Sequence, residues 1–460
     1  MSEILNNFNF YLNKLNEIVW GIPMLILLVG MGIFLSIRLK FFQIIKFKLI
    51  IKETLMKIIK NILKPDKRKR GEGGITPFQA LSTALAGTIG VGNIAGVATA
   101  IFIGGPGAVF WMWVSAFFGM MTKYSEVVLA VKYREKNKNG EYIGGPMLYI
   151  KKGLNSKFLA NVFAFCAVLA SFGMGNMTQA NSISAALKTG FNIPQEVTGV
   201  IVALLVGIVI IGGIKRVASV TEKIVPFMSI FYILGAVIVI AANYQEIPKS
   251  FSLIFGEAFK FKAVSGGILG SVMIKAMYAG IARGVFSNEA GLGSSSIAHA
   301  AAITDHPARQ GLWGAFEVFL DTLVVCTITA LAIITTGVWR SGELNGVDLS
   351  VSAFYSVLGD YGVWFLALSI LLFAFATIIG WSYYGEKCIE FLFSEKMLTP
   401  YKFIFVIFVF IGSVLELNTV WKISDTFNGL MAIPNLIALL FLSGIVVKTT
   451  KDAFNIHILK

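Results

Sequence analysis

The segment ALAGTIGVGNIAGVATA, residues 84–100, is apolar but carries glycines at positions 87, 90, 92 and 96, with polar Thr88 and Asn93 among them. A glycine inside a helix costs about 1 kcal/mol relative to alanine. In lipid, any backbone group freed by unwinding must also find another partner. Two interpretations follow. Either the small residues allow close helix packing, or the helix unwinds and offers carbonyls to a cation and amides to an anion.

A second glycine-rich segment, YAGIARGVFSNEAGLGSSS, covers residues 278–296. It contains Arg283 and Glu289, and charges at membrane depth are costly unless they are paired or hydrated. Six residues apart, the two charges lie on different faces of a regular helix, so only a break in the helix brings them together. We interpret them either as a structural ion pair near a helix end or as a gate or substrate contact.

The composition places both segments in a membrane protein. The 460 residues are 56% hydrophobic and 14% charged, against about 25% charged in a soluble domain. Apolar segments of about 18 residues or more recur along the chain, each able to cross a hydrocarbon layer of roughly 30 Å. We therefore predict an all-α integral membrane protein with about 11 transmembrane helices. The expected spans are 17–37, 75–103, 107–132, 158–187, 195–214, 217–243, 266–298, 310–338, 361–393, 401–417 and 421–447.

The basic residues predict the orientation of these spans. If the first helix begins outside, the cytoplasmic loops and C-terminal tail hold 29 of the 39 Lys and Arg residues, and the opposite set holds 7. The other three, Lys123, Lys275 and Arg283, lie within helices. The positive-inside rule then predicts a multi-pass plasma-membrane protein with its N-terminus outside and its C-terminus in the cytoplasm. The net charge of +14 is thus explained by topology, and we expect no nucleic-acid partner.

The spans also predict an internal symmetry. Without the first helix, ten helices divide into five plus five, and five is odd, so the second half enters the membrane from the opposite face, as in an inverted repeat. Each half opens with one of the glycine-rich segments, which favours the unwound interpretation. The expected parts are an extra helix with a basic interfacial segment (1–74), the first repeat (75–243), an extracellular loop (244–265), the second repeat (266–447) and a cytoplasmic tail (448–460).

Other polar residues in apolar segments are candidates for the same site. Asn176 and Gln179, with Thr178 beside them, either face the centre or form hydrogen bonds between helices. Thr377 and Trp381 are four residues apart and share a helix face. A hydroxyl and an indole on one face suit a pocket with a cation ligand and an apolar wall, although Trp381 is also explained as a core or interfacial aromatic.

Several functions have no residues to support them. The sequence contains no phosphate-binding loop and no helix with His and Glu at metal spacing. The glycines of GVGNIAG do not have the spacing of a dinucleotide-binding fingerprint. We therefore predict that the protein is not an enzyme and uses no organic cofactor. The three cysteines are expected to be buried core residues.

Four stretches carry a family resemblance: TPFQALSTALAGTIGVGNIAGVATAIFIGGPGAVFWMW, GGPMLYI (144–150), GVFSNEAGLGSSSIAHAAA and residues 371–387. With them the sequence resembles the alanine or glycine:cation symporter family, the sodium:alanine symporters, from about residue 17 onward. The resemblance implies the inverted-repeat fold of the LeuT-type transporters. It also implies import of small neutral amino acids, above all alanine and glycine, driven by a sodium gradient.

The resemblance further implies a substrate site at the breaks, with the carboxylate against amides at a half-helix N-terminus. The implied substrate-binding residues are Gly87, Thr88, Gly90, Val91, Gly92, Asn176, Gln179, Phe286, Ser287 and Trp381. The implied sodium ligands are the carbonyls of Ala86, Ile89 and Ala374 and the hydroxyl of Thr377. Arg283 and Glu289 are expected gate or coupling residues.

The sequence departs from the LeuT pattern in two ways. Ile378 stands where that pattern has a second hydroxyl, so the sodium site has one side-chain ligand fewer, to be replaced by carbonyls or water. The first broken helix has no carboxylate for the substrate amine, which must bind exposed carbonyls or Asn and Gln side chains. The expected function is sodium-coupled symport by alternating access. The alternatives are a proton-coupled carrier that titrates Glu289, and a channel or receptor that accumulates no substrate.

Overall fold

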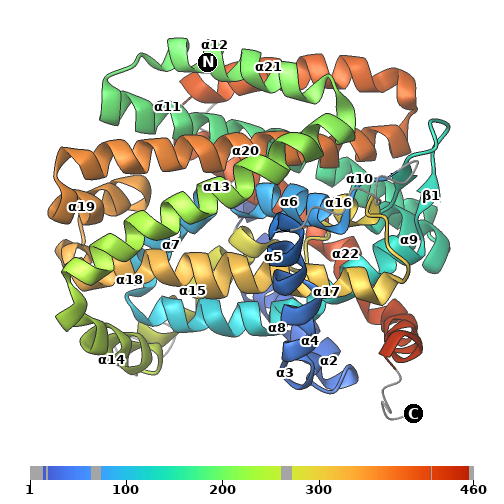
Figure 1. Ribbon diagram of the computed structural model, residues 1–460, viewed down its shortest axis with the longest axis horizontal. Coiled ribbons are helices and arrows are strands. Elements are labelled where there is room, and N and C mark those ends of the chain that lie inside the picture. The colour runs from blue at the N-terminus through green and yellow to red at the C-terminus, as the bar shows by residue number, and fades with distance from the viewer. Residues whose placement is uncertain (1–13, 17–18, 64–73, 261–271, 416, 455–460) are drawn as a thin grey trace.

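The computed structural model describes residues 14–16, 19–63, 74–260, 272–415 and 417–454, and these are almost entirely helical (Figure 1). Seven helical runs within the described residues are long and apolar enough to cross a membrane. They are Gly107–Lys132, Lys157–Phe191, Gly213–Ala242, Pro307–Thr336, Asp360–Leu392, Glu395–Val414 and Asp425–Phe454. The pair Pro77–Thr88 and Val91–Gly104, bent by 62°, makes an eighth. The predicted all-α, multi-span architecture is thus confirmed.

The first half of the chain begins with a separate helix and three short ones before the first break. The elements are α2 (Ile22–Arg38), α3 (Phe42–Ile45), α4 (Phe47–Glu53), α5 (Leu55–Leu63), α6 (Pro77–Thr88), η2 (Val91–Asn93), α7 (Ala95–Gly104), α8 (Gly107–Lys132), β1 (Glu135–Lys136), β2 (Tyr142–Ile143), α9 (Pro146–Gly153), α10 (Lys157–Phe172), the π-helix η3 (Gly173–Met177), α11 (Thr178–Phe191), α12 (Gln195–Ile210), α13 (Gly213–Ala242), η4 (Tyr244–Glu246) and α14 (Ile247–Ala258).

The second half begins with the second broken helix. Its elements are α15 (Val272–Asn288), α16 (Ser296–Ala300), α17 (Pro307–Val318), the π-helix η6 (Phe319–Cys326), α18 (Thr327–Thr336), η7 (Val338–Ser341), α19 (Gly346–Leu358), α20 (Asp360–Leu392), η8 (Glu395–Met397), α21 (Leu398–Val414) and α22 (Leu417–Phe454). The long helices run roughly parallel (Figure 1). We call their two ends the α19 end, which carries α14 and α19, and the hairpin end, which carries β1 and α9.

Some expected boundaries differ from the structure. Two expected spans, 17–37 and 195–214, form α2 with 17 residues and α12 with 16, which are shorter than the other spans. The expected start of the second repeat, residues 266–271, lies outside the described residues. The count of eleven helices and the five-plus-five repeat therefore stay predictions.

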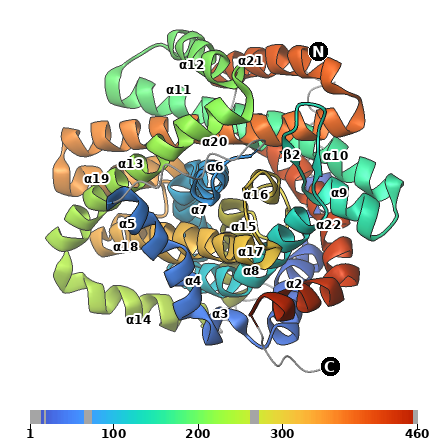
Figure 2. The same ribbon diagram turned by 45° about the vertical axis from the view of Figure 1, so that its right-hand side comes forward.

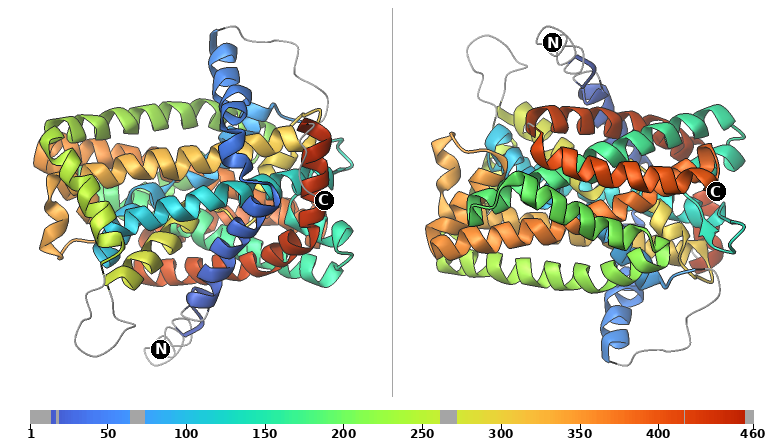
Figure 3. Two further views of the ribbon diagram at one scale, coloured as in Figure 1. Left: turned by 90° about the horizontal axis from the view of Figure 1, so that it is seen from below. Right: turned by 90° about the horizontal axis from the view of Figure 1, so that it is seen from above.

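The basic segment after α2 turns across the bundle. In Figure 3 the helices α4 and α5 run across the direction of the long helices. Ile50 of α4 is buried, and α4 packs against α17. The interfacial position expected for this segment stays a prediction, and residues 64–73 lie outside the described part of the chain.

Both glycine-rich segments are broken, as the unwound interpretation predicts. Residues 89–94 separate α6 from α7, and residues 289–295 separate α15 from α16. In the second break Glu289, Gly291 and Gly293 have φ angles of 55°, 98° and 81°. Only glycine adopts such angles without strain, which explains the two glycines. Figure 2 shows the four half-helices at the centre of the bundle.

The two broken helices are joined to each other at the hairpin end. Ile75, just before α6, forms a parallel backbone bridge with Ala302, just after α16. The amide of Ile75 donates to Ala301 O (3.1 Å), and the amide of Ile303 donates to Ile75 O (2.8 Å). Arg134 donates to the carbonyls of both Ala300 (3.0 Å) and Ala302 (2.5 Å). The half-helices α6 and α16 therefore share one hydrogen-bonded connection.

The second break gives a stability prediction. Gly293→Ala puts a Cβ 2.5 Å from Pro146 Cγ at a positive φ, with a backbone cost of roughly 1–2 kcal/mol in addition to the clash. We expect a lower midpoint of thermal unfolding for the purified protein in detergent. The matched control is Gly256→Ala on α14, where a Cβ meets no atom within 4 Å. Equal midpoints for the two variants would contradict the described backbone.

Candidate functional site

The first break frees backbone carbonyls because the amides that would bond to them point elsewhere. In a continuous helix the amide of Gly90 would bond to Ala86 O, and that of Asn93 to Ile89 O. Instead the amide of Gly90 donates to the side-chain oxygen of Asn93 (2.9 Å), and the amide of Asn93 donates to Gly90 O (3.2 Å). The carbonyls of Ala86 and Ile89 thus lose their helical donors in a buried position.

A neighbouring amide is diverted in the same way. The amide of Val91 lies 3.4 Å from Gln179 Oε1, a long hydrogen bond that replaces the helical bond to Gly87 O. The side-chain amide of Gln179 donates to Met174 O (3.0 Å) in the π-helix η3. This arrangement brings Gln179 to the break, as predicted, and fixes its orientation.

Helix α20 lies directly against the freed carbonyls. A Cβ on Gly90 would stand 2.5 Å from Thr377 Oγ1, and a Cβ on Gly380 would stand 3.4 Å from the carbonyl carbon of Ala86. Ala374, one turn before Thr377, is buried as well. The structure therefore places Thr377 and Gly380 of α20 against Gly90 and Ala86 of the first broken helix.

The second break contacts the first. A Cβ on Gly92 would meet both the ring of Phe286 and the Cα of Ser287 at 3.4 Å. The hydroxyl of Ser287 donates to Asp321 Oδ2 (2.9 Å), and the side chain of Asn93 donates to Asp321 Oδ1 (2.7 Å). Asp321, fully buried on η6, thus accepts hydrogen bonds from both broken segments and holds them in register.

A second buried charged group, Lys123 on α8, supports the second break from the other side. Its ammonium donates to Ser295 Oγ (2.6 Å) and to Glu289 O (3.1 Å). It also lies 3.6 Å from Glu317 and 4.0 Å from Glu126, with all three side chains fully buried. Lys123 therefore compensates two buried carboxylates and a carbonyl that the break exposes.

Arg283 and Glu289 are not brought together, so of the two interpretations the ion pair between them is wrong. Arg283 lies 3.8 Å from Asp425 of α22, and its guanidinium is 5.6 Å from the centre of the Phe286 ring. Glu289 accepts hydrogen bonds from Trp381 Nε1 (2.8 Å) and from Ser294. The reason is that α15 stays helical to Asn288, which leaves Arg283 more than one turn from the break.

Three other candidates have roles that the sequence left open. The side-chain amide of Asn176 donates to Phe405 O on α21 (2.7 Å), so it forms the interhelical bond that was the alternative to a site contact. Trp381 packs on η3, where a Cβ on Gly175 would overlap it at 2.3 Å, and it orients Glu289. The hydroxyl of Thr88 donates to Ala84 O (3.3 Å) inside α6.

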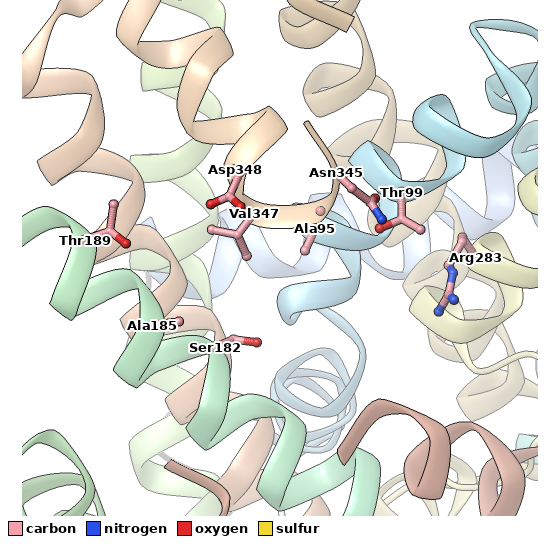
Figure 4. Close-up of a pocket in the computed structure, with 10 residues that line it drawn as sticks. Ala95, Thr99, Ser182, Ala185, Thr189, Arg283, Asn345, Val347 and Asp348 are labelled. Carbon is pink, nitrogen blue, oxygen red and sulfur yellow. The ribbon is translucent and has the colours of Figure 1, made fainter. Parts of the chain in front are cut away.

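A cavity of about 440 Å³ lies on the α19 side of the breaks (Figure 4). It is enclosed by α7, α11, α15 and the start of α19, and Arg283 and Asp348 supply charged groups to its wall. Its lining residues are Ala95, Thr99, Ser182, Ala185, Thr189, Arg283, Asn345, Gly346, Val347 and Asp348. At the hairpin end, by contrast, the Ile75–Ala302 bridge ties the two half-helices together, and Arg134 bonds to carbonyls on the α16 side of that bridge.

The profile described as "Sodium:alanine symporter family" matches residues 5–457. The chain belongs to this family. It is 48% identical over 456 residues to the "Sodium/alanine symporter AgcS" of Methanococcus maripaludis, with 98% of each chain covered. It is 39% identical over 439 residues to the "Probable sodium/glutamine symporter GlnT" of Bacillus subtilis, covering 95% of this chain and 89% of that one. These relatives are transporters, not enzymes.

A solved structure shows the same fold. The crystal structure of MhsT in complex with L-phenylalanine matches with a TM-score of 0.58 at 13% identity, covering 83% of this chain and 99% of that one. At this identity the likeness concerns the fold alone. This member of the sodium:alanine symporter family therefore has the LeuT-type fold that the resemblance implied, and it is a multi-pass membrane protein.

Sequence reasoning missed Asp321, Lys123 and Glu126 as site-supporting residues of this symporter-family chain. Each is an ionisable residue in an expected span, which is a signal for function in itself. Their partners lie far away in sequence, however: Lys123 and Ser295 are 172 residues apart, and Asn93 and Asp321 are 228 apart. The sequence therefore identifies the charged residues within the spans but does not predict which residues they bond to.

The Lys123 cluster gives a second prediction. Lys123→Met leaves Glu126 and Glu317 buried without their cation, a change that costs about 3–5 kcal/mol in such sites. We expect a large fall in the thermal unfolding midpoint, which adding Glu317→Gln partly restores. The control Lys57→Met removes an exposed pair with Glu53 and should change the midpoint little. Simple addition of the Lys123 and Glu317 effects would show that the two side chains do not interact.

Proposed function

We propose that the protein is a sodium-coupled symporter that brings small neutral amino acids, alanine and glycine, into the cell by alternating access. The observation that carries this proposal is that the first break frees the carbonyls of Ala86 and Ile89 where Thr377 of α20 lies against Gly90. The names of its relatives support sodium as the coupling ion and an amino acid as the substrate. Both ligands would bind where the two broken helices meet.

The proposed sodium site consists of the carbonyls of Ala86, Ile89 and Ala374 with the hydroxyl of Thr377. Oxygen ligands of this kind line the ion sites of broken-helix transporters. The diversion of the Gly90 and Asn93 amides supplies two of these carbonyls without leaving them in lipid. Ile378, buried in α20, gives no hydroxyl, so the site relies on backbone oxygens more than the LeuT pattern does.

The proposed substrate site lies beside the ion, between the two breaks. The amides of Val91 and Gly92 would hold the carboxylate, since the amide of Gly90 is already bonded to Asn93. The long contact between Val91 and Gln179 is one that a carboxylate can replace. Thr88 and Ser287 would border the ligand. The ring of Phe286, within 3.4 Å of a Cβ placed on Gly92, would limit the ligand to a small side chain.

The structure also suggests how access alternates. If the orientation predicted from the basic residues holds, the cavity of Figure 4 opens to the outside. Arg283, between Asp425 and the Phe286 ring, would then be the outer gate above the substrate site. The Ile75 bridge and the Arg134 contacts would close the cytoplasmic side. Preferential binding of sodium to the outward-facing state would couple the ion to the transport cycle.

The main test is uptake of labelled alanine by proteoliposomes with and without an inward sodium gradient. We expect accumulation only with the gradient, and loss of accumulation when choline replaces sodium. Equal uptake in both conditions would exclude sodium coupling. Uptake that survives choline but stops when the pH gradient is collapsed would instead support the alternative, a proton-coupled carrier in which Glu289, bonded to Trp381, carries the proton.

A substitution tests the sodium site itself. Thr377→Ala removes the hydroxyl ligand, and we expect the half-saturating sodium concentration to rise about tenfold, equivalent to about 1.4 kcal/mol, with little change in substrate preference. Thr377→Ser should restore sodium affinity. Thr335→Ala is the matched control, because Thr335 likewise bonds to a carbonyl in its own helix. A changed substrate preference at unchanged sodium affinity would place Thr377 in the substrate site instead.

A further inference from the structure

A second cavity, of about 510 Å³, lies between α2, the first turns of α8 and α15. Its walls are aliphatic and aromatic, and Lys275 is the charged side chain among the described residues that line it. We call it the α2 groove. It lies apart from the breaks, and nothing in the proposed transport mechanism uses it.

The groove lies along one face of α2, while the opposite side of the same helix packs closely against α8. On one side of the helix, a Cβ on Gly32 would overlap Phe118 of α8 at 2.8 Å, so the two backbones are in close contact. On the groove side, a Cβ on Gly30 would meet no atom within 4 Å. Ile26 and Ile33 beside it are 65% and 37% exposed. An apolar space at membrane depth is not stably filled by water, so hydrocarbon is the occupant that suits it.

The residues at one end of the groove suit a headgroup. Lys275 lies in the first turn of α15, is exposed, and forms no ion pair within the described part of the chain. Trp111 and Tyr278 flank the groove, and the Trp111 indole is fixed by a hydrogen bond to Ala258 O (3.1 Å). Trp, Tyr and Lys together are typical of the membrane–water interface. The predicted topology places this end at the outer surface.

We propose that the α2 groove binds a phospholipid of the outer leaflet, with one acyl chain along Gly30 and an anionic headgroup at Lys275. The cation selects a headgroup with an uncompensated negative charge over a zwitterionic one. Because Met277 and Ile281 of α15 line the groove, the chain fills the space between α2 and the outer half of the second broken helix. The lipid thereby braces α15 against α2.

The test is native mass spectrometry of the full chain in mild detergent, with phosphatidylglycerol and phosphatidylcholine added at equal concentration. We expect one retained phospholipid per chain, with phosphatidylglycerol preferred. Gly30→Phe fills the groove and should abolish retention. Gly256→Phe on α14, where a Cβ also meets no atom within 4 Å, should keep it. Lys275→Gln should retain a lipid but lose the preference, whereas Lys249→Gln, a lysine paired with Glu246, should keep both.

Several outcomes overturn the proposal. Retention by Gly30→Phe equal to that of the unsubstituted protein would show that lipid binds elsewhere. An unchanged headgroup preference in Lys275→Gln would exclude the headgroup contact. A dimer that Gly30→Phe converts to a monomer would assign the groove to a second copy of the chain. Gly30→Leu is a smaller substitution at the same position. The unfolding midpoint of both Gly30 variants in lipid-free detergent shows whether the fold is kept when lipid retention is lost. None of these readouts depends on transport.

Discussion

A backbone carbonyl in the interior of a membrane protein must have a partner, and the first break is built around that constraint. Asn93 satisfies an amide at the break, not the carbonyls. Its side-chain oxygen takes the amide of Gly90, and its amino group reaches Asp321, so one residue ends α6 and ties it to η6. The carbonyls of Ala86 and Ile89 remain without their helical donors, in a segment that lies against α20. Asp321 and Lys123 then hold the second break beside the first through buried hydrogen bonds.

The charged residues are distributed unevenly along the bundle. Towards the hairpin end, Lys123 and three glutamates form a buried network around the second break. Towards the α19 end, the visible closure is an ion pair of 3.8 Å between Arg283 and Asp425 at the edge of a cavity. Separating a partly exposed pair costs far less than separating buried, hydrogen-bonded charges. The two ends therefore differ in how easily they open.

The sequence was sufficient for features set by local chemistry. Closely spaced glycines predicted both breaks, and hydropathy predicted the long helices. It was not sufficient where the geometry depends on distant residues. An ion pair between Arg283 and Glu289 was one of two interpretations of the sequence, and the continuity of α15 keeps these residues apart. The bond of Asn176 to α21 and the π-helices η3 and η6 depend on packing between helices, which the hydrophobic periodicity of the sequence does not predict. The sequence shows Asp321 as a charged residue within an expected span, but the two side chains that donate hydrogen bonds to it come from distant segments of the chain.

The backbone bridge between Ile75 and Ala302 affects how many ways the transporter can move. Two broken helices with free ends would give two independent hinges, and one half-helix could swing while the other stayed still. The bridge joins the residue before α6 to those after α16, and Arg134 holds the carbonyls of Ala300 and Ala302 beside it. In the proposed alternating-access cycle, displacing one half-helix without the other would require these two backbone hydrogen bonds to be broken.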